Sequence, residues 1–253
     1  MKLKKFSLLL ICAIIGFVAC KKDDDGDVEE FIPRDRAEQQ VADMDSIGKY
    51  LDSHYVNLDE LLAKGGDAGI EDIVIVEVEE DDEAPDGYTL LRDAVGEPKS
   101  LTYADVAYQY YVLEINEGGG EGSPTFADTV QILYEGSLLD GTMFDSKYVP
   151  DNNPLDLTGL IKGWQAVIPN FNIAESYVEN SDGTVDYYNS GLGVMIIPSG
   201  LAYFYSSTPG ESYAPLVFKF ELLDYEENDH DGDGIPSYLE DLNSNGESFT
   251  ADG

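Results

Sequence analysis

Residues 130–145 are the part of the sequence that most narrowly limits the fold. They read Val-Gln-Ile-Leu-Tyr-Glu-Gly-Ser-Leu-Leu-Asp-Gly-Thr-Met-Phe-Asp. The first half alternates in character, as in a strand with one buried face, and a Leu-Asp-Gly turn follows at 139–141. Because a second strand begins near Phe144, directly after this turn, the stretch predicts a β-hairpin.

Three more segments follow in order along the chain. They are Gly-Leu-Ile-Lys-Gly-Trp at 159–164, Val-Met-Ile-Ile-Pro-Ser-Gly-Leu-Ala-Tyr at 194–203 and Pro-Leu-Val-Phe-Lys-Phe-Glu-Leu-Leu at 215–223. With the hairpin, they resemble the FKBP-type peptidyl-prolyl cis-trans isomerases, which have a pocket hairpin, a helix carrying a tryptophan, an Ile-Pro-x-x-x-Ala-Tyr bend and a closing strand. Four matches in one order are far more specific than any single match.

The resemblance implies an α+β fold and an FKBP-like domain over 106–226. A bent antiparallel sheet of five or six strands would wrap around one short helix near 160–168, with a shallow aromatic pocket between them. The strand at 108–116 would open the domain, and a turn-rich connector with several glycines would follow it.

The resemblance also implies which residues form the pocket. Trp164 would lie beneath the proline ring of the substrate, while the backbone N–H of Ile161 and the hydroxyl of Tyr203 would bind its carbonyl groups. Asp145 would lie beside the carbonyl that rotates. The other catalytic walls would be Tyr134, Phe144 and Phe218, and the further substrate-binding residues would be Leu155 and Leu160. The alternative for each aromatic residue is ordinary core packing.

Such a pocket needs neither a nucleophile nor a metal ion to catalyse rotation of an X–Pro bond. An X–Pro bond rotates slowly because amide resonance imposes a barrier of about 18–20 kcal/mol. A pocket that binds the twisted amide more tightly than the planar one lowers this barrier, and apolar walls assist by excluding water. The resemblance therefore predicts an isomerase of X–Pro polypeptides that uses no catalytic cofactor.

Two segments depart from the family pattern. Residues 171–191 contain an insertion with an Asp-Gly turn, which predicts an extra hairpin that covers the pocket or binds a client. Residues 204–215 are shorter than usual and lack the paired apolar residues that overhang the pocket in the family, so Tyr205 or Tyr213 would have to replace them. Asp145 has no basic partner at the usual spacing, although Lys147 is close in sequence.

The N-terminus predicts export and lipid attachment. Three lysines within the first five residues precede a short apolar stretch, as in a signal peptide over 1–19. Cys20 then resembles the lipidated first residue of a bacterial lipoprotein, unless cleavage occurs elsewhere and leaves it free. The acidic tether at 20–30 resembles a Bacteroidetes-type surface-export signal, or serves only as a spacer. We expect an outer-membrane lipoprotein that faces the periplasm or the cell surface.

Residues 31–105 predict a helix followed by short strands. Apolar side chains recur at spacings of three and four, as in an amphipathic helix over 34–55: Val41, Met44, Ile47, Leu51 and Tyr55. Residues 72–79, rich in β-branched side chains, predict a strand, and 88–91 a second one. The helix would pack on its own domain, or alternatively form a dimer, as in some bacterial surface isomerases of the family.

The C-terminal residues 227–253 carry a calcium-loop pattern. Oxygen ligands occupy positions 1, 3, 5 and 12 of a loop with glycine at position 6, and a second such loop abuts the first. Abutting loops leave no room for flanking helices, so they resemble thrombospondin type 3-like repeats with structural calcium. The candidate ligands are Asp229, Asp231, Asp233, Glu240, Asp241, Asn243, Asn245 and Asp252. His230 is expected to be solvated, and the alternative is an acidic tail without metal.

Charge excludes some partners. The chain has 14 basic and 51 acidic residues, a net charge of −37, which repels nucleic acid and anionic lipid headgroups. Membrane contact is therefore expected only through Cys20. The sequence as a whole predicts an isomerase that assists the folding of envelope or surface proteins. The alternatives are a non-catalytic peptide- or protein-binding module of a surface assembly, and a calcium-stiffened structural component.

Overall fold

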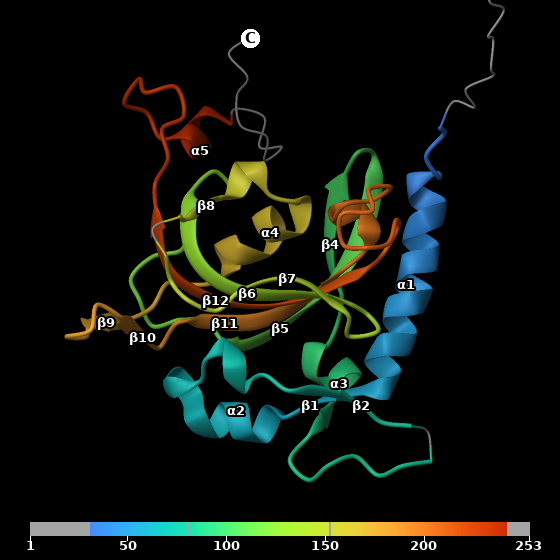
Figure 1. Cartoon of the computed structure of the whole chain (residues 1–253). Coiled ribbons are helices and arrows are strands. Elements are labelled where there is room, and N and C mark those ends of the chain that lie inside the picture. The colour runs from blue at the N-terminus through green and yellow to red at the C-terminus, as the bar shows by residue number, and fades with distance from the viewer. Residues whose placement is uncertain (1–30, 80, 152, 242–253) are drawn as a thin grey trace, which may run out of the picture. The chain divides into compact units, whose positions relative to one another are not determined.

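The computed structural model describes residues 31–79, 81–151 and 153–241 (Figure 1). The chain divides into two compact units, Met1–Ile32 and Pro33–Gly253, and every element described below belongs to the second. The expected signal peptide, Cys20 and the acidic tether lie outside the described residues. Within the described ranges, no helix is both long enough and apolar enough to cross a membrane.

One antiparallel sheet organises the second unit. Its strand order is β4-β5-β11-β12-β6-β7, and β8 pairs with the start of β6. The strands are β4 Lys99–Tyr103, β5 Val106–Asn116, β6 Thr129–Leu138, β7 Met143–Lys147, β8 Leu155–Asp156, β11 Gly191–Ile197 and β12 Leu216–Glu226. The predicted α+β class is confirmed, and so is the hairpin of β6 and β7. The sheet has seven strands rather than five or six, since β4 pairs with β5 along its whole length.

The expected short helix lies in the curve of this sheet (Figure 1). It is α4, Lys162–Val167, which the 3₁₀ turn η4, Ile168–Asn170, continues. Trp164 and Val167 of α4 pack with Met195 and Phe218 of the sheet in one buried cluster. Alternate side chains of each strand point to this face, and they form the floor on which the pocket is built.

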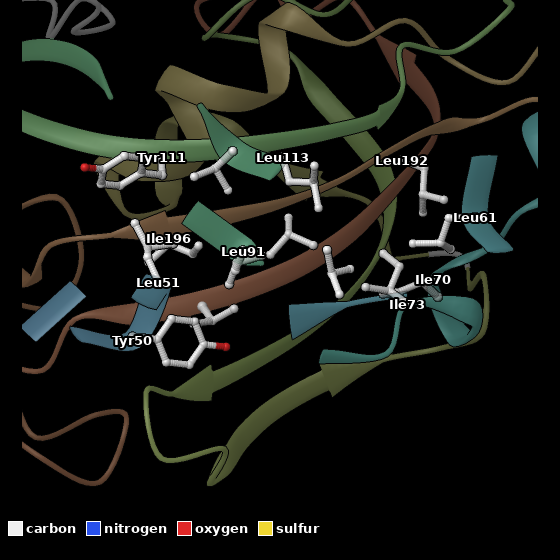
Figure 2. Packing of buried hydrophobic residues seen from close by; sticks show 14 of the residues in the cluster. Tyr50, Leu51, Leu61, Ile70, Ile73, Leu91, Tyr111, Leu113, Leu192 and Ile196 are labelled. Carbon is white, nitrogen blue, oxygen red and sulfur yellow. The ribbon is translucent and has the colours of Figure 1, made fainter. Parts of the chain in front are cut away.

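The opposite face of the sheet is buried as well. It packs against the N-terminal segment, whose elements are α1 Arg36–Ser53, β1 His54–Val56, α2 Leu58–Lys64, η1 Gly65–Asp67, η2 Ile70–Asp72, β2 Ile75–Glu77, β3 Thr89–Leu90 and α3 Leu91–Val95. Figure 2 shows Leu51 and Leu91 of this segment near Ile196 of the sheet, and Leu61 near Leu192. All seven residues of β11 are buried, as expected for a strand covered on both faces.

The helix predicted over 34–55 is confirmed, but its buried face differs from the expected one. Asp35 caps the helix by accepting hydrogen bonds from the N–H groups of Ala37 and Glu38. Ile47 and Leu51 are fully buried as expected. Val41, however, is 71% exposed, because the first half of α1 faces a polar loop of the domain instead of the apolar sheet.

Polar side chains replace the apolar stripe in the first half of α1. They are Gln39, Gln40 and Asp43, all buried. Asp43 accepts hydrogen bonds from the backbone N–H of Ser199 at 2.8 Å and from its hydroxyl at 2.6 Å. Ser199 begins the 3₁₀ turn η5, Ser199–Leu201, so a buried carboxylate fastens the N-terminal segment to the loop that follows β11.

Two other predictions for the N-terminal segment differ from the structure, one in the length of a strand and one in the element that contains Tyr55. The strand expected over 72–79 is reduced to β2, Ile75–Glu77, because Asp72 closes η2 by accepting a hydrogen bond from the N–H of Gly69 at 3.0 Å. Tyr55, expected on the helix, lies in β1, where it pairs with Val76 of β2 and Leu90 of β3. These short strands form a small sheet of their own.

The inserted hairpin is present. It consists of β9, Ser176–Glu179, and β10, Val185–Tyr188, which pair antiparallel around the Asp182-Gly183 turn. The side chain of Asp182 accepts hydrogen bonds from Thr184 within the turn. A last short helix, α5, spans Ser237–Glu240 near the end of the described residues.

Candidate active site

Four elements and the turn after η5 bring the predicted aromatic residues together. Trp164 of α4 lies under Phe218 of β12, with ring centroids 5.1 Å apart, and meets Tyr134 of β6 edge-on at 5.8 Å. Phe144 of β7 packs edge-to-face on Phe218 at 5.7 Å and on Tyr203 at 6.3 Å. Edge-to-face aromatic pairs favour this geometry. Trp164 is only 5% exposed and Phe218 only 2%, so these two form the base of the cluster.

Gly136 sets how closely two of these rings approach the sheet. A Cβ atom at this position of β6 would lie 2.6 Å from Cε1 of Phe218 and 2.8 Å from Cζ of Phe144. Both rings therefore lie directly over the strand backbone. The absent side chain at this position lets β6 and β7 form one wall of the pocket.

We expect Gly136→Ala to displace Phe144 and Phe218 and to destabilise the fold by about 1–3 kcal/mol, since overpacking forces rings off their preferred positions. Urea unfolding measures the stability, and peptide binding measures the pocket. Gly159→Ala is the matched control, because a Cβ atom there meets nothing within 4 Å. Equal stability of the two variants would contradict the close packing described here.

Asp145 has a partner, but not a basic one. Its carboxylate accepts a hydrogen bond from the hydroxyl of Tyr134 at 3.0 Å. Lys147, the nearest lysine in sequence, instead pairs with Asp151 at 2.6 Å and donates to the backbone oxygen of Asn153. Burial first, and the bond to Asp145 second, raise the pKa of Tyr134 to about 12. The phenol therefore stays protonated at neutral pH and holds the carboxylate at the pocket edge.

Two hydrogen-bond donors at the pocket have no acceptor among the described residues. Among the described residues, nothing accepts a hydrogen bond from the backbone N–H of Ile161 or from the hydroxyl of Tyr203. Burial, together with the negative charge of Asp145, raises the pKa of Tyr203 above its ordinary value, so this hydroxyl is a donor at neutral pH. These are the two groups that the sequence predicted to bind substrate carbonyls.

A capped turn positions the segment that carries Ile161. Asp156 accepts hydrogen bonds from the N–H and hydroxyl of Thr158 at 2.9 and 2.7 Å, and so begins the 3₁₀ turn η3, Leu157–Gly159. The amide of Gln165 donates to the backbone oxygens of Leu157 and Leu160. Leu155, in β8, and Leu160 are half-buried against the aromatic cluster. Eight of the nine predicted pocket residues therefore lie in or against this cluster, and the ninth, Asp145, is hydrogen-bonded to Tyr134 of the cluster.

A cavity of about 460 Å³ adjoins the cluster and contains Leu160, Ile161 and Tyr203 in its wall. It extends from the proline pocket toward residues that the sequence analysis missed: Arg36 of α1, Tyr103 of β4 and Lys162 of α4. Arg36 and Tyr103 come from the segment before the expected domain. They reach the cavity only because α1 and β4 pack beside η5. No local sequence motif predicts this packing.

The short loop at 204–215 supplies one of its two tyrosines to this cavity. Tyr205 lines it. Tyr213 does not; its ring packs edge-on against Phe204 at 5.1 Å, and its hydroxyl accepts a hydrogen bond from the N–H of Arg34 at 3.1 Å. Of the two candidates to replace the overhanging apolar residues, only Tyr205 lies at the right place.

The inserted hairpin contributes to a different part of the surface. Residues 185–188 of β10 line a cavity together with 66–69 of the N-terminal segment and with Glu221. None of the nine predicted pocket residues lines that cavity. The suggestion that the hairpin covers the pocket is therefore wrong for the conformation described. The insertion extends the surface formed with the N-terminal segment.

The C-terminal acidic residues are partly described. Carboxylate oxygens of Asp229, Asp231 and Asp233 lie within 4.8 Å of one another. Asp229 accepts hydrogen bonds from the N–H groups of Gly232 and Gly234, both at 2.8 Å. The pKa of Glu240 is raised by partial desolvation and then by the charges of these aspartates. Of the other predicted ligands, Asp241 ends the described residues, and Asn243, Asn245 and Asp252 lie outside them.

His230 is exposed, as expected, but its ring also forms hydrogen bonds. Its Nε2 lies 3.0 Å from a carboxylate oxygen of Asp156, and its Nδ1 lies 2.7 Å from the hydroxyl of Ser237. Asp156 is the residue that caps η3 beside the pocket. The histidine therefore ties the start of the acidic repeat to the domain, because its two ring nitrogens reach partners on both sides.

Comparison with known proteins identifies the family. Residues 120–223 match the family model of the FKBP-type peptidyl-prolyl cis-trans isomerases. The chain is 30% identical over 136 residues to the FKBP-type peptidyl-prolyl cis-trans isomerase FkpA of Escherichia coli, covering 53% of this chain and 43% of that protein. It is 36% identical over 110 residues to FK506-binding protein 1A of Aspergillus fumigatus, covering 42% of this chain and 85% of that protein.

Among solved structures, a peptidyl-prolyl cis-trans isomerase of Pseudomonas syringae pv. tomato aligns with a TM-score of 0.39 and 23% identity, over 53% of this chain and 86% of that one. The chain spans less than half the length of the E. coli relative. Because it matches most of the length of the Aspergillus protein at 36% identity, the chain belongs to the FKBP-type peptidyl-prolyl cis-trans isomerase family.

Proposed function

We propose that the chain catalyses cis-trans isomerisation of X–Pro bonds in polypeptides. The observation that carries the proposal is the pair of unsatisfied donors, Ile161 N–H and Tyr203 hydroxyl, beside an aromatic cluster with Trp164 at its base. An apolar ring fits the cluster, and the peptide carbonyls next to it find two donors. The site thus matches a proline and its flanking amides.

Selective binding of the twisted amide provides the catalysis. In the transition state the amide loses its resonance, and the carbonyl turns away from the plane. Apolar walls from Phe144, Phe218 and Trp164 keep water from the carbonyl, which water would otherwise stabilise in the planar state. The donors and the fixed carboxylate of Asp145 are already oriented, so they do not have to reorganise as the amide twists.

We expect Asp145→Ala to lower kcat/KM for X–Pro peptides by about tenfold to about a hundredfold. Hydrogen bonds to charged groups contribute about 1.5–3 kcal/mol, and each 1.36 kcal/mol is a factor of about ten in rate. The measurement is a proline-isomerisation assay on residues 31–253. Tyr134→Phe, which removes the donor to Asp145 but keeps the ring, should lose part of the same activity.

Glu114→Ala is the control, since Glu114 is an exposed carboxylate on β5. Unchanged activity in Asp145→Ala, with the fold intact by circular dichroism, would exclude a role for this carboxylate. No activity in the unmodified chain with any of several X–Pro peptides would favour the second candidate, a non-catalytic peptide- or protein-binding module. The short 204–215 loop, which gives the pocket Tyr205 but not Tyr213, supports that alternative.

We further propose that the protein is an exported lipoprotein that assists the folding of envelope or surface proteins. The signal-like residues 1–19 and the Cys20 position support this. Labelling with a fatty-acid analogue in cells, compared between the natural chain and Cys20→Ala, tests the attachment. Loss of the label and release from the membrane fraction in Cys20→Ala are expected. An unlabelled natural chain would contradict the proposal.

A structural calcium ion at the C-terminal repeat is a proposal of the same kind. Asp229, Asp231 and Asp233 gather their carboxylates, and oxygen ligands of this type suit calcium. We expect calcium to raise the thermal midpoint and chelator to reverse it, with a dissociation constant of about 10⁻⁴–10⁻³ M as in extracellular modules. Asp231→Asn should weaken the effect. An equal response to magnesium would argue against a calcium-specific site.

Dimerisation through 34–55 is also a proposal. It would have to use the outward side of α1, where Val41 is exposed, because the inward side packs on the sheet. Sedimentation of residues 31–253, with Val41→Glu as the variant, distinguishes a dimer from a monomer.

A further inference from the structure

The cavity beside the proline pocket differs in charge from the rest of the protein. Among the described residues, its wall contains two basic side chains, Arg36 and Lys162, and no acidic one. The whole chain, in contrast, has 51 acidic residues against 14 basic ones. The cavity lined by β10 and the N-terminal segment has five carboxylates, Asp67, Glu71, Asp72, Asp186 and Glu221. The cavities beside Asp224 and beside Glu77 also contain carboxylates, so a wall without a described acidic residue stands apart from these three cavities.

Arg36 is held in place by aromatic rings rather than by an ion pair. Its guanidinium carbon lies 4.2 Å from the centre of the Phe204 ring and 5.6 Å from that of Tyr103. Such stacking fixes a guanidinium group while leaving its edge available. Its two hydrogen bonds to other residues, to the Tyr108 hydroxyl and the Gly200 oxygen, both leave from Nη1. No described residue accepts a hydrogen bond from its Nη2 or Nε.

Five other basic side chains in the described ranges form ion pairs with carboxylates. The ion pairs of lysine and arginine there are Lys49–Asp45, Lys64–Glu60, Lys64–Asp72, Arg92–Asp52, Lys147–Asp151 and Lys219–Glu135. No described carboxylate lies within ion-pair distance of Arg36. An arginine that is oriented by stacking, and whose outer edge meets no carboxylate of the described residues, is suited to bind a carboxylate from another molecule.

The cavity is continuous with the reaction site. Ile161 and Tyr203, the two carbonyl-binding groups, stand in the same wall as Arg36 and Lys162. Lys162 directly follows Ile161 in the chain, and its Nζ lies 5.8 Å from the centre of the Tyr103 ring. A peptide held at the proline pocket therefore passes its neighbouring residue into a basic, aromatic-lined space.

We propose that this cavity is a specificity subsite that binds a carboxylate of the client next to its X–Pro bond. The inference rests on the proposed isomerase function. The favoured clients are polypeptides with aspartate or glutamate beside proline. A nucleic acid does not fit, because the net charge of −37 repels an extended polyanion. A single carboxylate interacts mainly within a Debye length, about 8 Å at physiological salt, where Arg36 and Lys162 dominate.

The test uses matched peptides that differ only in one charge. Glu-Pro and Pro-Glu peptides are compared with their Gln counterparts, all with amidated C-termini, and a Gln peptide with a free C-terminus next to proline tests a terminal carboxylate as the source. For the natural chain, we expect kcat/KM to favour the acidic peptides by about threefold to about tenfold. The difference should lie mainly in KM and should shrink as salt rises from low to molar concentration.

Arg36→Gln should bring the ratio between acidic and neutral peptides close to one. Arg36→Lys keeps the charge but loses the planar fork, so it should retain part of the preference. Lys49→Gln is the matched control, since it removes a positive charge from the same helix on its exposed side, and should keep the full ratio. A preference only for the free C-terminus would assign the subsite to a terminal carboxylate.

The outcomes separate this inference from the isomerase proposal. Turnover of acidic and neutral peptides at equal rates would overturn the subsite while supporting the isomerase. If no peptide is turned over, Trp164 fluorescence still reports binding, because it is the one tryptophan of the chain. Equal dissociation constants for the two peptides would then overturn the subsite as well. Tighter binding of the acidic peptide, lost in Arg36→Gln, would support it without catalysis.

Discussion

Removal of the N-terminal segment is expected to destroy the fold of the FKBP-like domain. A chain of residues 97–241 keeps every strand of the main sheet, but it uncovers the face opposite the pocket. The apolar side chains then exposed are Tyr111, Leu113, Leu133, Leu192, Val194, Ile196, Val217 and Leu223. Burying one such side chain is worth about 1.5–3 kcal/mol, and a domain is stable by only about 5–15 kcal/mol in total.

The expected result is therefore aggregation, or an expanded state that binds a hydrophobic dye. Gel filtration and near-ultraviolet circular dichroism, beside residues 31–241 as the control, measure it. A second truncation, residues 31–227, removes the acidic repeat but leaves both faces of the sheet covered. It should stay folded and monodisperse. A stable monomer of 97–241 would contradict the role assigned to the N-terminal segment.

Trp164→Ala carries the second large effect. Trp164 is 5% exposed and meets Tyr134, Phe218 and Phe220 with ring centroids 5.1–6.1 Å apart. Replacing a buried aromatic residue with alanine costs about 3–5 kcal/mol, which is a large share of a typical domain's stability. We expect weakened or lost folding and loss of peptide binding, measured by urea unfolding and by isomerisation of X–Pro peptides.

Trp164→Phe keeps an aromatic ring in the same place and separates stability from activity. It should unfold at a urea concentration closer to that of the natural chain, but still bind proline peptides more weakly because the smaller ring covers less of the pyrrolidine. A Trp164→Ala protein with unchanged stability would show that the cavity closes around the missing ring. Full activity in that protein would exclude Trp164 as the base of the pocket.

The FKBP-like domain was predictable because its sequence signals are local and follow one another in the family's order. The β6–β7 hairpin follows from alternation up to Gly136 and the turn at 139–141. The tryptophan of α4 and the tyrosine after η5 stand at positions fixed by short motifs. The family resemblance then predicted that Trp164, Phe144, Phe218 and Tyr203 meet, and the ring distances agree.

The remainder depends on contacts between distant parts of the chain. No pattern in α1 shows that Asp43 will be buried, because its partner Ser199 lies 156 residues away. The apolar rule assigned Val41 to the buried face for the same reason. Burial raises the pKa of Asp43 against the lowering effect of its hydrogen bonds. The burial of this carboxylate can be explained only once the position of the loop that carries Ser199, its hydrogen-bond donor, is known.

The basic cavity was missed for a related reason. Arg36 and Tyr103 belong to segments that the sequence separated from the reaction domain, and Lys162 looked like an ordinary surface lysine of the tryptophan helix. In a chain with 14 basic residues, the scarcity of positive charge was the available signal. This scarcity does not show where in the fold the basic residues lie. Arg36, Tyr103 and Lys162 come together only when α1 and β4 pack beside η5 (Figure 1).

The most direct test of the central claim measures binding and catalysis in one sample. Residues 31–253 are titrated with a Glu-Pro peptide while Trp164 fluorescence reports occupancy and nuclear magnetic resonance exchange reports the cis-trans rate of the same peptide. We predict that the exchange rate rises in proportion to the occupied fraction, and that both signals are lost when a tight proline-mimicking ligand fills the pocket. A saturating fluorescence change with no acceleration would contradict catalysis and leave a binding module.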